Sequence, residues 1–150
     1  AILFRLVGSE MCIRDRSRLA RALAAFLETV DGENLLQGFK RANNIVMQAE
    51  QNDGVEYSYG ADIKFAETDE ERALFKALET NEPVIKKAIQ AQDFTLAMKS
   101  LASLRAPVDG FFEGVQVNTD KQVIRRNRLN LLSKMRSVCL AVADLSRIEG

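Results

Sequence analysis

The sequence has no histidine among its 150 residues. Histidine is the side chain used most often as a general base and as a metal ligand. The two cysteines, Cys12 and Cys139, lie far apart and have no CxxC spacing, which argues against a zinc site and against a disulfide framework. These absences predict no catalytic residue and no metal ligand, and they favour a reducing, cytoplasmic setting.

Two further absences exclude whole classes of function. The sequence contains neither GxGxxG nor GxxxxGK[ST], so it has no glycine-rich loop that could hold the phosphates of a nucleotide. It also has no apolar run near the roughly 18–20 residues that a membrane-spanning helix needs, so we expect no membrane partner. The 21 basic residues equal the 21 acidic ones, and nucleic-acid binding would therefore require a local basic patch.

The first 16 residues differ in character from the rest of the chain. They lack the charged start and longer apolar core of a secretory signal, and "LVGSEMCIRDRS" resembles translated sequencing-adapter sequence. We therefore predict that residues 1–16 are a non-native leader and that residues 17–150 form one domain. The alternative is that the leader is a genuine short helix.

From Ser17 onward, the apolar residues follow a helical period. Positions 19, 22, 23, 26 and 27 form one apolar stripe, and a second helix is expected over residues 32–51, with Asp31 as its cap. No segment shows a convincing strand alternation. The predicted fold class is all-α, a helical bundle of about six or seven helices packed mostly antiparallel through short loops.

Several polar residues have the spacing of helix caps. Thr68 and Glu71 form a capping box, so the acidic run at 67–71 indicates a helix start rather than a metal site. Asp93 is expected to cap another helix, and Asn81 a further one with Pro83 in its first turn.

The loop predicted at residues 52–60 contains two tyrosines. Tyr57 and Tyr59 flank Ser58, and aromatic side chains in a loop can stack on unpaired bases. Packing of the loop against the domain is the favoured interpretation.

A long helix is expected over residues 120–147. Its apolar face runs along Leu131, Met135, Val138 and Val142, with Cys139 as a small buried hydrophobe. From residue 120 to the end, seven basic residues face three acidic ones, a net charge of +4 in a chain whose total is zero. This excess has two interpretations: a surface that contacts phosphates, or an ordinary solvated face.

Within that helix, the most polar sector contains Arg126, Asn130, Ser133 and Ser137, and phosphates would contact this sector if the first interpretation held. From composition alone, the solvated face is the favoured interpretation. Arg128 instead projects near the apolar face, where an unpaired charge is costly.

The stretch "RAPVDGFFEGVQVN" at 105–118 contains two carboxylates, Asp109 and Glu113, four residues apart. They lie on one flank of a short helix, so we predict an ion pair with Arg128 rather than acid–base catalysis. The residues expected to have structural roles here are Pro107, Asp109, Phe111, Phe112 and Arg128.

Four stretches together resemble the C-terminal region of the bacterial glycyl-tRNA synthetase beta subunit. They are "FLETVDGENLLQGFKRANNI" (26–45), "LASLRAPVDGFFEGVQVN" (101–118), "RNRLNLLSKMR" (126–136) and "VADLSRIEG" (142–150). The resemblance implies a helical anticodon-binding domain of the DALR type, which contributes to tRNA recognition for ATP-dependent attachment of glycine. On this basis the fragment itself is non-catalytic and holds no cofactor.

The same resemblance implies partners and contact residues. The partners are glycine tRNA and an alpha subunit that carries the ATP-dependent catalytic site, in an assembly of two alpha and two beta chains. DNA is not an expected partner. The residues expected to contact RNA are Lys40, Arg41, Asn44, Arg125 and Arg126. The alternative function is a non-catalytic helical domain with a structural or protein-interaction role.

Overall fold

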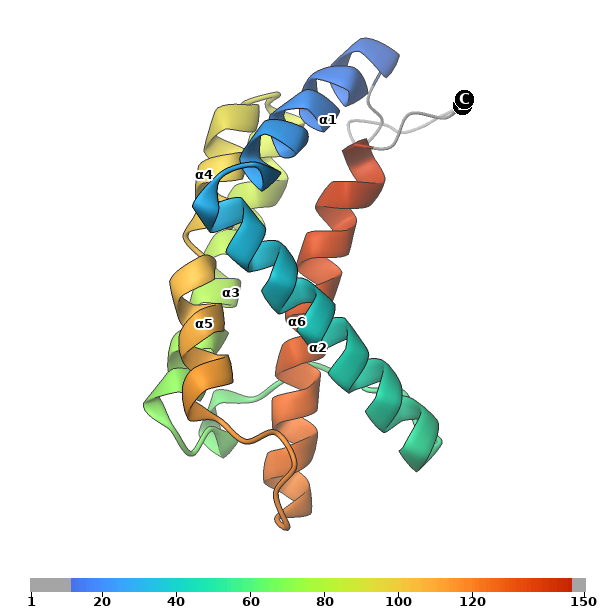
Figure 1. The fold of residues 1–150 in the computed structure, drawn as a ribbon, viewed down its shortest axis with the longest axis vertical. Helices are drawn as coiled ribbons and strands as arrows, with labels where there is room; N and C mark the ends of the chain where they lie inside the picture. The colour runs from blue at the N-terminus through green and yellow to red at the C-terminus, as the bar shows by residue number, and fades with distance from the viewer. Residues whose placement is uncertain (1–11, 147–150) are drawn as a thin grey trace.

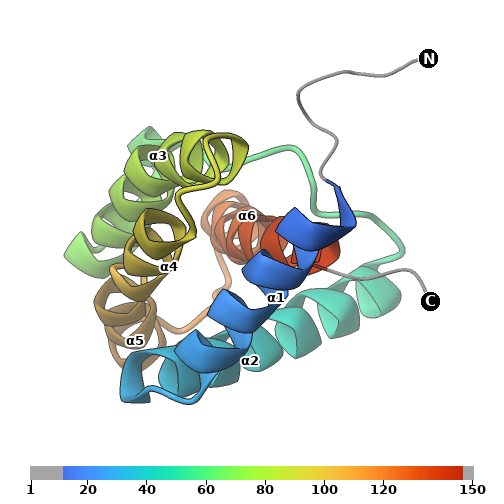
Figure 2. The same ribbon diagram turned by 90° about the horizontal axis from the view of Figure 1, so that it is seen from above.

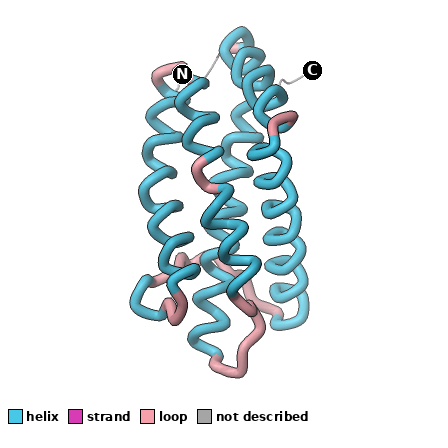
Figure 3. The backbone as a smooth tube through the Cα atoms, turned by 60° about the vertical axis from the view of Figure 1, so that its left-hand side comes forward, coloured by secondary structure: helices cyan, strands magenta, loops and turns pink. Residues whose placement is uncertain are grey.

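The structure is a computed structural model that describes residues 12–146, and this part of the chain is all-α, as predicted. Figure 3 shows helices and loops and no strand in the described residues. The elements are α1 (Ile13–Leu27), α2 (Val30–Asp53), the 3₁₀ helix η1 (Ile63–Phe65), α3 (Asp69–Gln90), α4 (Phe94–Ala102), α5 (Arg105–Gly114) and α6 (Gln122–Ser146).

Most of the predicted leader lies outside the described residues. Helix α1 begins at Ile13, so the last residues of the predicted leader form its first turn. In that turn the Asp15 carboxylate accepts a 2.7 Å hydrogen bond from the Gln92 amide. The non-native origin of residues 1–16 stays a prediction.

Helix α6 runs through the middle of the bundle (Figures 1 and 2). It contacts α1, α2 and α3. Helices α4 and α5 close the bundle between α3 and the first two helices, since α4 packs on α3 and α1 and α5 packs on α3 and α2 (Figure 2). On the remaining side, the segment between α2 and α3 passes beside α6 (Figure 2). None of the helices in residues 12–146 has the length and hydrophobicity needed to cross a bilayer.

The apolar face predicted for the last helix is buried. Leu131, Met135, Val138 and Val142 are each at most 4% exposed. Leu129, which points to another side of the helix, is also fully buried, because α6 has neighbours on several sides. Burial raises the pKa of the Cys139 thiol to about 12, which suits an inert, packed side chain.

The helix starts follow local hydrogen bonding. The Thr68 hydroxyl accepts from the Glu71 N–H at 3.1 Å, and the Glu71 carboxylate accepts from the Thr68 N–H at 2.9 Å, which confirms the capping box. Asp93 caps α4 by accepting from the Leu96 N–H at 3.1 Å, also as predicted. Gly54 ends α2 in the left-handed conformation, with φ of 68°.

Two predicted caps are wrong. Asn81 starts no helix: α3 continues through Pro83 to Gln90, and the Asn81 amide instead donates to the Ala77 carbonyl. Packing of the residues on both sides of Pro83 outweighs the loss of one backbone hydrogen bond. The cap of α2 is Thr29, whose hydroxyl accepts from the Gly32 N–H, and Asp31 lies inside the first turn.

Two glycines permit close packing of the first helices. A Cβ atom on Gly32 would lie 1.9 Å from the Phe26 carbonyl oxygen, so the tight turn between α1 and α2 needs glycine. A Cβ atom on Gly38 would lie 2.6 Å from Val108 Cγ1, which shows how closely α2 approaches α5. These contacts fix the inner side of α2 and leave its outer side to solvent.

Candidate nucleic-acid interface

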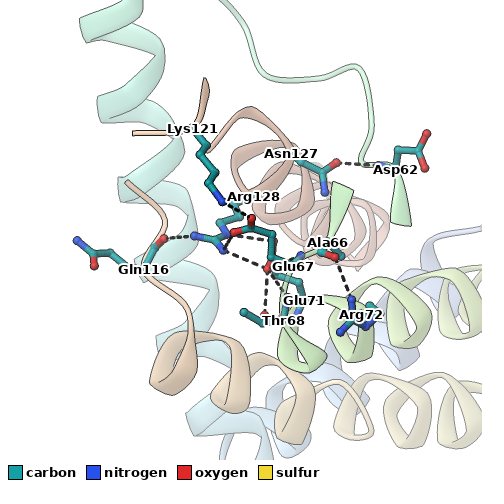
Figure 4. Close-up of polar contacts among 10 residues, drawn as sticks. All are labelled: Asp62, Ala66, Glu67, Thr68, Glu71, Arg72, Gln116, Lys121, Asn127 and Arg128. Atoms are coloured by element: carbon teal, nitrogen blue, oxygen red, sulfur yellow. Dashed lines mark hydrogen bonds and ion pairs between the residues drawn. The ribbon is translucent and has the colours of Figure 1, made fainter. Parts of the chain in front are cut away.

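Arg128 of α6 forms a buried ion pair, but with a partner that the sequence analysis did not predict. Its guanidinium donates to both carboxylate oxygens of Glu71, at 3.0 and 3.2 Å, and to the Gln116 carbonyl at 2.6 Å (Figure 4). Glu67 lies at 3.5 Å from the same group. The Arg128 side chain is 8% exposed and that of Glu71 is fully buried, so the pair ties the start of α3 to α6.

The predicted pairing of Arg128 with Asp109 and Glu113 is therefore wrong. Asp109 accepts a 3.2 Å hydrogen bond from Arg105, one turn earlier in the same helix, and Arg105 also donates to Asp31 at 2.8 Å. Glu113 is exposed. Periodicity showed that Arg128 points inward, but it did not show that the start of α3 packs against that side of α6.

The other predicted structural residues of this stretch all lie in α5. Pro107 is in the first turn, where its missing N–H leaves no broken hydrogen bond. Phe111 is fully buried, and its ring meets that of Phe112 edge-on, with centroids 5.7 Å apart.

The environment of Glu71 favours its charged form. Burial by itself raises the pKa of this carboxyl, but the hydrogen bonds from Arg128 and from Thr68 outweigh burial and leave the pKa below its ordinary value. The carboxylate is therefore ionised at neutral pH and is fully occupied by its donors. It is a structural group and is not available as an acid or base.

Most of the other cations near α6 are also paired. Each of four side chains reaches a carboxylate on a neighbouring segment: Lys121 to Glu67 at 2.9 Å, Arg125 to Asp53 at 2.8 Å, Lys134 to Glu82 at 2.8 Å, and Arg136 to Glu50 at 3.8 Å. Arg126 is exposed and has no carboxylate partner among residues 12–146. Between residues 121 and 136, the basic residues therefore do not form an open basic face.

Arg125 belongs to a hydrogen-bond network that holds the loop after α2. Its guanidinium donates to Asp53, to the Asn118 side-chain oxygen at 3.1 Å and to the Tyr57 hydroxyl at 3.3 Å. Hydrogen bonds from Tyr57 and then from Arg125 hold the pKa of Asp53 below its usual range. Only 18% of the Arg125 side chain is exposed.

The two tyrosines of this loop have different environments. Tyr57 is buried and bonded to Asp53, in agreement with packing of the loop. Tyr59 is 89% exposed, so packing does not describe it.

The polar sector predicted on the last helix is mostly covered. Asn130 and Ser133 are 6% and 4% exposed, which leaves Arg126 and Ser137 as its exposed members. The nearby Asn127, which the sequence analysis missed, accepts a 2.8 Å hydrogen bond from the Asp62 N–H. Asn127 thereby fastens the loop after α2 against α6, and no sequence signal distinguishes it from a solvated asparagine.

The outer side of α2 contrasts with α6. From residue 34 to residue 49 the helix has two basic residues, Lys40 and Arg41, and no acidic one. Both are exposed, and neither has a carboxylate partner within the described part of the chain. Their exposed neighbours are uncharged: Gln37, Asn44, Met47 and Gln48. We call residues 37, 40, 41, 44, 47 and 48 the α2 face.

An open groove of about 510 Å³ borders this face. Arg41 and Ile45 of α2 form one wall, and the end of α5 with the loop after it, residues 112–118, forms the other. The Arg41 guanidinium lies over the Phe112 ring at 4.7 Å from its centroid. The predicted contact residues Lys40, Arg41 and Asn44 thus lie together, whereas Arg125 and Arg126 lie on α6.

The described residues contain no group of three or more histidine, cysteine, aspartate or glutamate side chains that could hold a metal ion. The pattern of an exposed basic and amide-rich helix face beside a groove is instead typical of contact with a polyanion.

Comparison with known families identifies the fold. Residues 35–146 match the DALR anticodon binding domain. The chain belongs to this family. The match begins inside α2 and ends with α6, so it includes the α2 face, the groove and the Arg128–Glu71 pair. It confirms the anticodon-binding domain predicted from the sequence.

Curated relatives of this DALR domain share one description. The chain is 70% identical over 131 residues to the glycine–tRNA ligase beta subunit of Dinoroseobacter shibae, and 67% identical over 131 residues to that of Ruegeria. It is 48% identical over 130 residues to that of Rhodospirillum centenum. These alignments cover 86–87% of this chain but 18–19% of each relative. No solved structure matches the chain.

Proposed function

We propose that this DALR domain is the tRNA-binding module of a glycine–tRNA ligase beta subunit and that it binds glycine tRNA through the α2 face. The observation that carries the proposal is the exposed pair Lys40 and Arg41, on a helix stretch without acidic residues, in a chain of an anticodon-binding family. Phosphate contacts by such side chains account for most of the affinity of proteins for nucleic acids.

Because the relatives are glycine–tRNA ligase beta subunits, we extend the proposal to the whole enzyme. In that enzyme, the domain helps to select the tRNA for ATP-dependent attachment of glycine in the cytoplasm. An alpha subunit carries the catalytic site, in an assembly of two alpha and two beta chains. The fragment is non-catalytic in this proposal, because Glu71, the only fully buried carboxylate of residues 12–146, is occupied by structural donors.

The predicted contact residues divide into two roles. Lys40, Arg41, Asn44 and Arg126 are exposed and contact RNA directly in this proposal. Arg125 is bonded to Asp53 and Asn118, and it acts by positioning the loops at the ends of α2 and α5.

Binding of fluorescein-labelled glycine tRNA to the 150-residue chain, measured by anisotropy at several salt concentrations, tests the proposal. We expect affinity that falls steeply as salt rises, and tighter binding of glycine tRNA than of an unrelated tRNA. Binding no stronger than that of a neutral protein of similar size would contradict it.

One observation favours the alternative role in protein interaction. An apolar groove of about 140 Å³ lies between α1, α2 and α6, lined by residues such as Leu23, Leu36, Phe39 and Leu140, and Leu140 is 41% exposed. The chain spans under a fifth of the length of its curated relatives, so other parts of such a subunit are available to cover this groove. This role predicts no preference for glycine tRNA.

A further inference from the structure

Arg41 differs from an ordinary surface arginine because its guanidinium is seated on an aromatic ring, with Cζ 4.7 Å from the ring centroid. It lies over the ring of Phe112, and Phe112 in turn packs edge-on against the fully buried Phe111. The stack therefore rests on the core of the domain. The contact with the ring restricts the guanidinium, while the Arg41 side chain as a whole stays exposed to solvent.

The loop opposite Arg41 is fixed at two points. The Gln116 carbonyl accepts a 2.6 Å hydrogen bond from Arg128, and the Asn118 side-chain oxygen accepts one at 3.1 Å from Arg125. Because the oxygen of Asn118 is taken, its amide NH₂ is left to donate. The Gln116 side chain is exposed beside it. The groove wall is thus preorganised and has amide groups along its rim.

These features match one ligand chemistry. Unpaired bases stack on arginine guanidinium planes and bond through their edges to amides. A bare phosphate suits the groove less well, because the Glu113 carboxylate also lines it. We propose that the groove between Arg41 and residues 112–118 binds one unpaired nucleobase of the tRNA, stacked on Arg41 and bonded by Gln116 and Asn118.

This inference rests on the proposed function and deepens it. It gives Arg41 the role of reading a base, and it leaves Lys40, with its compact charge and no stacking partner in the described residues, to contact phosphate. The two neighbouring residues should therefore respond differently to substitution.

Arg41→Lys tests the stacking directly, because it keeps the charge and removes the plane. The probe is a labelled stem–loop of glycine tRNA, in a set where each loop base in turn is replaced by an abasic ribose. We expect Arg41→Lys to weaken binding of the intact RNA about tenfold, with the salt dependence unchanged. One abasic position should weaken wild-type binding by a similar factor and have no effect on the variant.

The matched control is Lys40→Gln, which should reduce the salt dependence by about one unit and leave the abasic pattern unchanged. Circular dichroism checks that the variants fold. Wild-type-like affinity of Arg41→Lys, or abasic positions that weaken both proteins equally, would overturn the inference while the proposed function stands. If the wild-type chain bound no tRNA, the proposed function would fail, and the inference with it.

Discussion

Helix α6 and the α2 face both contain basic residues, but the structure uses them in opposite ways. Of the six basic residues from Lys121 to Arg136, five reach a carboxylate within the described chain. The two on the α2 face reach none there. The segment with the larger sequence charge is therefore the poorer candidate for binding a polyanion.

The cause of this difference is position in the fold. Helix α6 is central, so its long side chains extend along its flanks and meet acidic groups from α2, α3 and the loop before α3. Helix α2 has packed neighbours only on its inner side, where Gly38 meets α5. Along its outer side no other helix of residues 12–146 is packed (Figure 1), and no carboxylate in that part of the chain pairs with Lys40 or Arg41.

Among substitutions that test this difference between paired and unpaired cations, we expect Arg128 to give the largest change in stability. Arg128→Met leaves the buried Glu71 carboxylate without its main partner, and we expect the free energy of unfolding to fall by about 3–5 kcal/mol. Urea unfolding at neutral pH measures it. Arg126→Met is the matched control and should change stability by no more than about 0.5 kcal/mol, because Arg126 is exposed. Equal effects of the two substitutions would contradict the division into paired and free cations.

Acid should weaken the same ion pair. The pKa of Glu71 is lower in the folded protein than its ordinary value, so the folded chain binds fewer protons than the unfolded chain in this range. Its contribution to stability is complete above an ordinary glutamate pKa of about 4.3 and is lost as pH falls through the lowered value.

Urea unfolding between pH 7 and pH 3 checks this for the wild type and for Glu71→Gln. The wild type should lose more stability on acidification than the variant does. Parallel losses would show that Glu71 does not have a lowered pKa.

A smaller effect is expected at Arg125. Arg125→Gln removes hydrogen bonds to Asp53, Tyr57 and Asn118. We expect the free energy of unfolding to fall by about 1 kcal/mol, because solvent near the Arg125–Asp53 pair weakens its electrostatic contribution. Lys40→Gln, on the α2 face, should cost less than about 0.5 kcal/mol. Thermal unfolding of the two variants compares their stabilities. A larger loss of stability for Lys40→Gln would contradict the view that Arg125 is a structural cation and Lys40 an unpaired one.

The sequence predicted the family through its resemblance to known stretches. It also predicted the all-α fold and the caps at Thr68 and Asp93, because periodicity and capping depend on residues close together in the chain, but the predicted caps at Asp31 and Asn81 were wrong. It correctly predicted the capping box at Thr68 and Glu71, and it showed that Arg128 points inward. It did not predict that these two features meet, because that requires the packing of α3 against α6. Pro83 was misjudged for the same reason: packing along α3 determines that the helix continues.

The candidate site was predicted unevenly. Lys40, Arg41 and Asn44 lie together on the α2 face because they share one helix. The groove beside Arg41 depends on contact between α2 and residues 112–118, which no local pattern predicts. The ion pair of Arg125 likewise depends on Asp53, which lies at the end of another helix, α2.

The most direct test of the central claim compares the salt dependence of glycine tRNA binding in two double variants. Lys40→Gln with Arg41→Gln removes both charges of the α2 face, and Arg125→Gln with Lys134→Gln removes two paired charges of α6. We expect the slope of log affinity against log salt to fall by about one to two units for the first pair and to change by less than about half a unit for the second. A flattened slope for the α6 pair with an unchanged slope for the α2 pair would contradict the account.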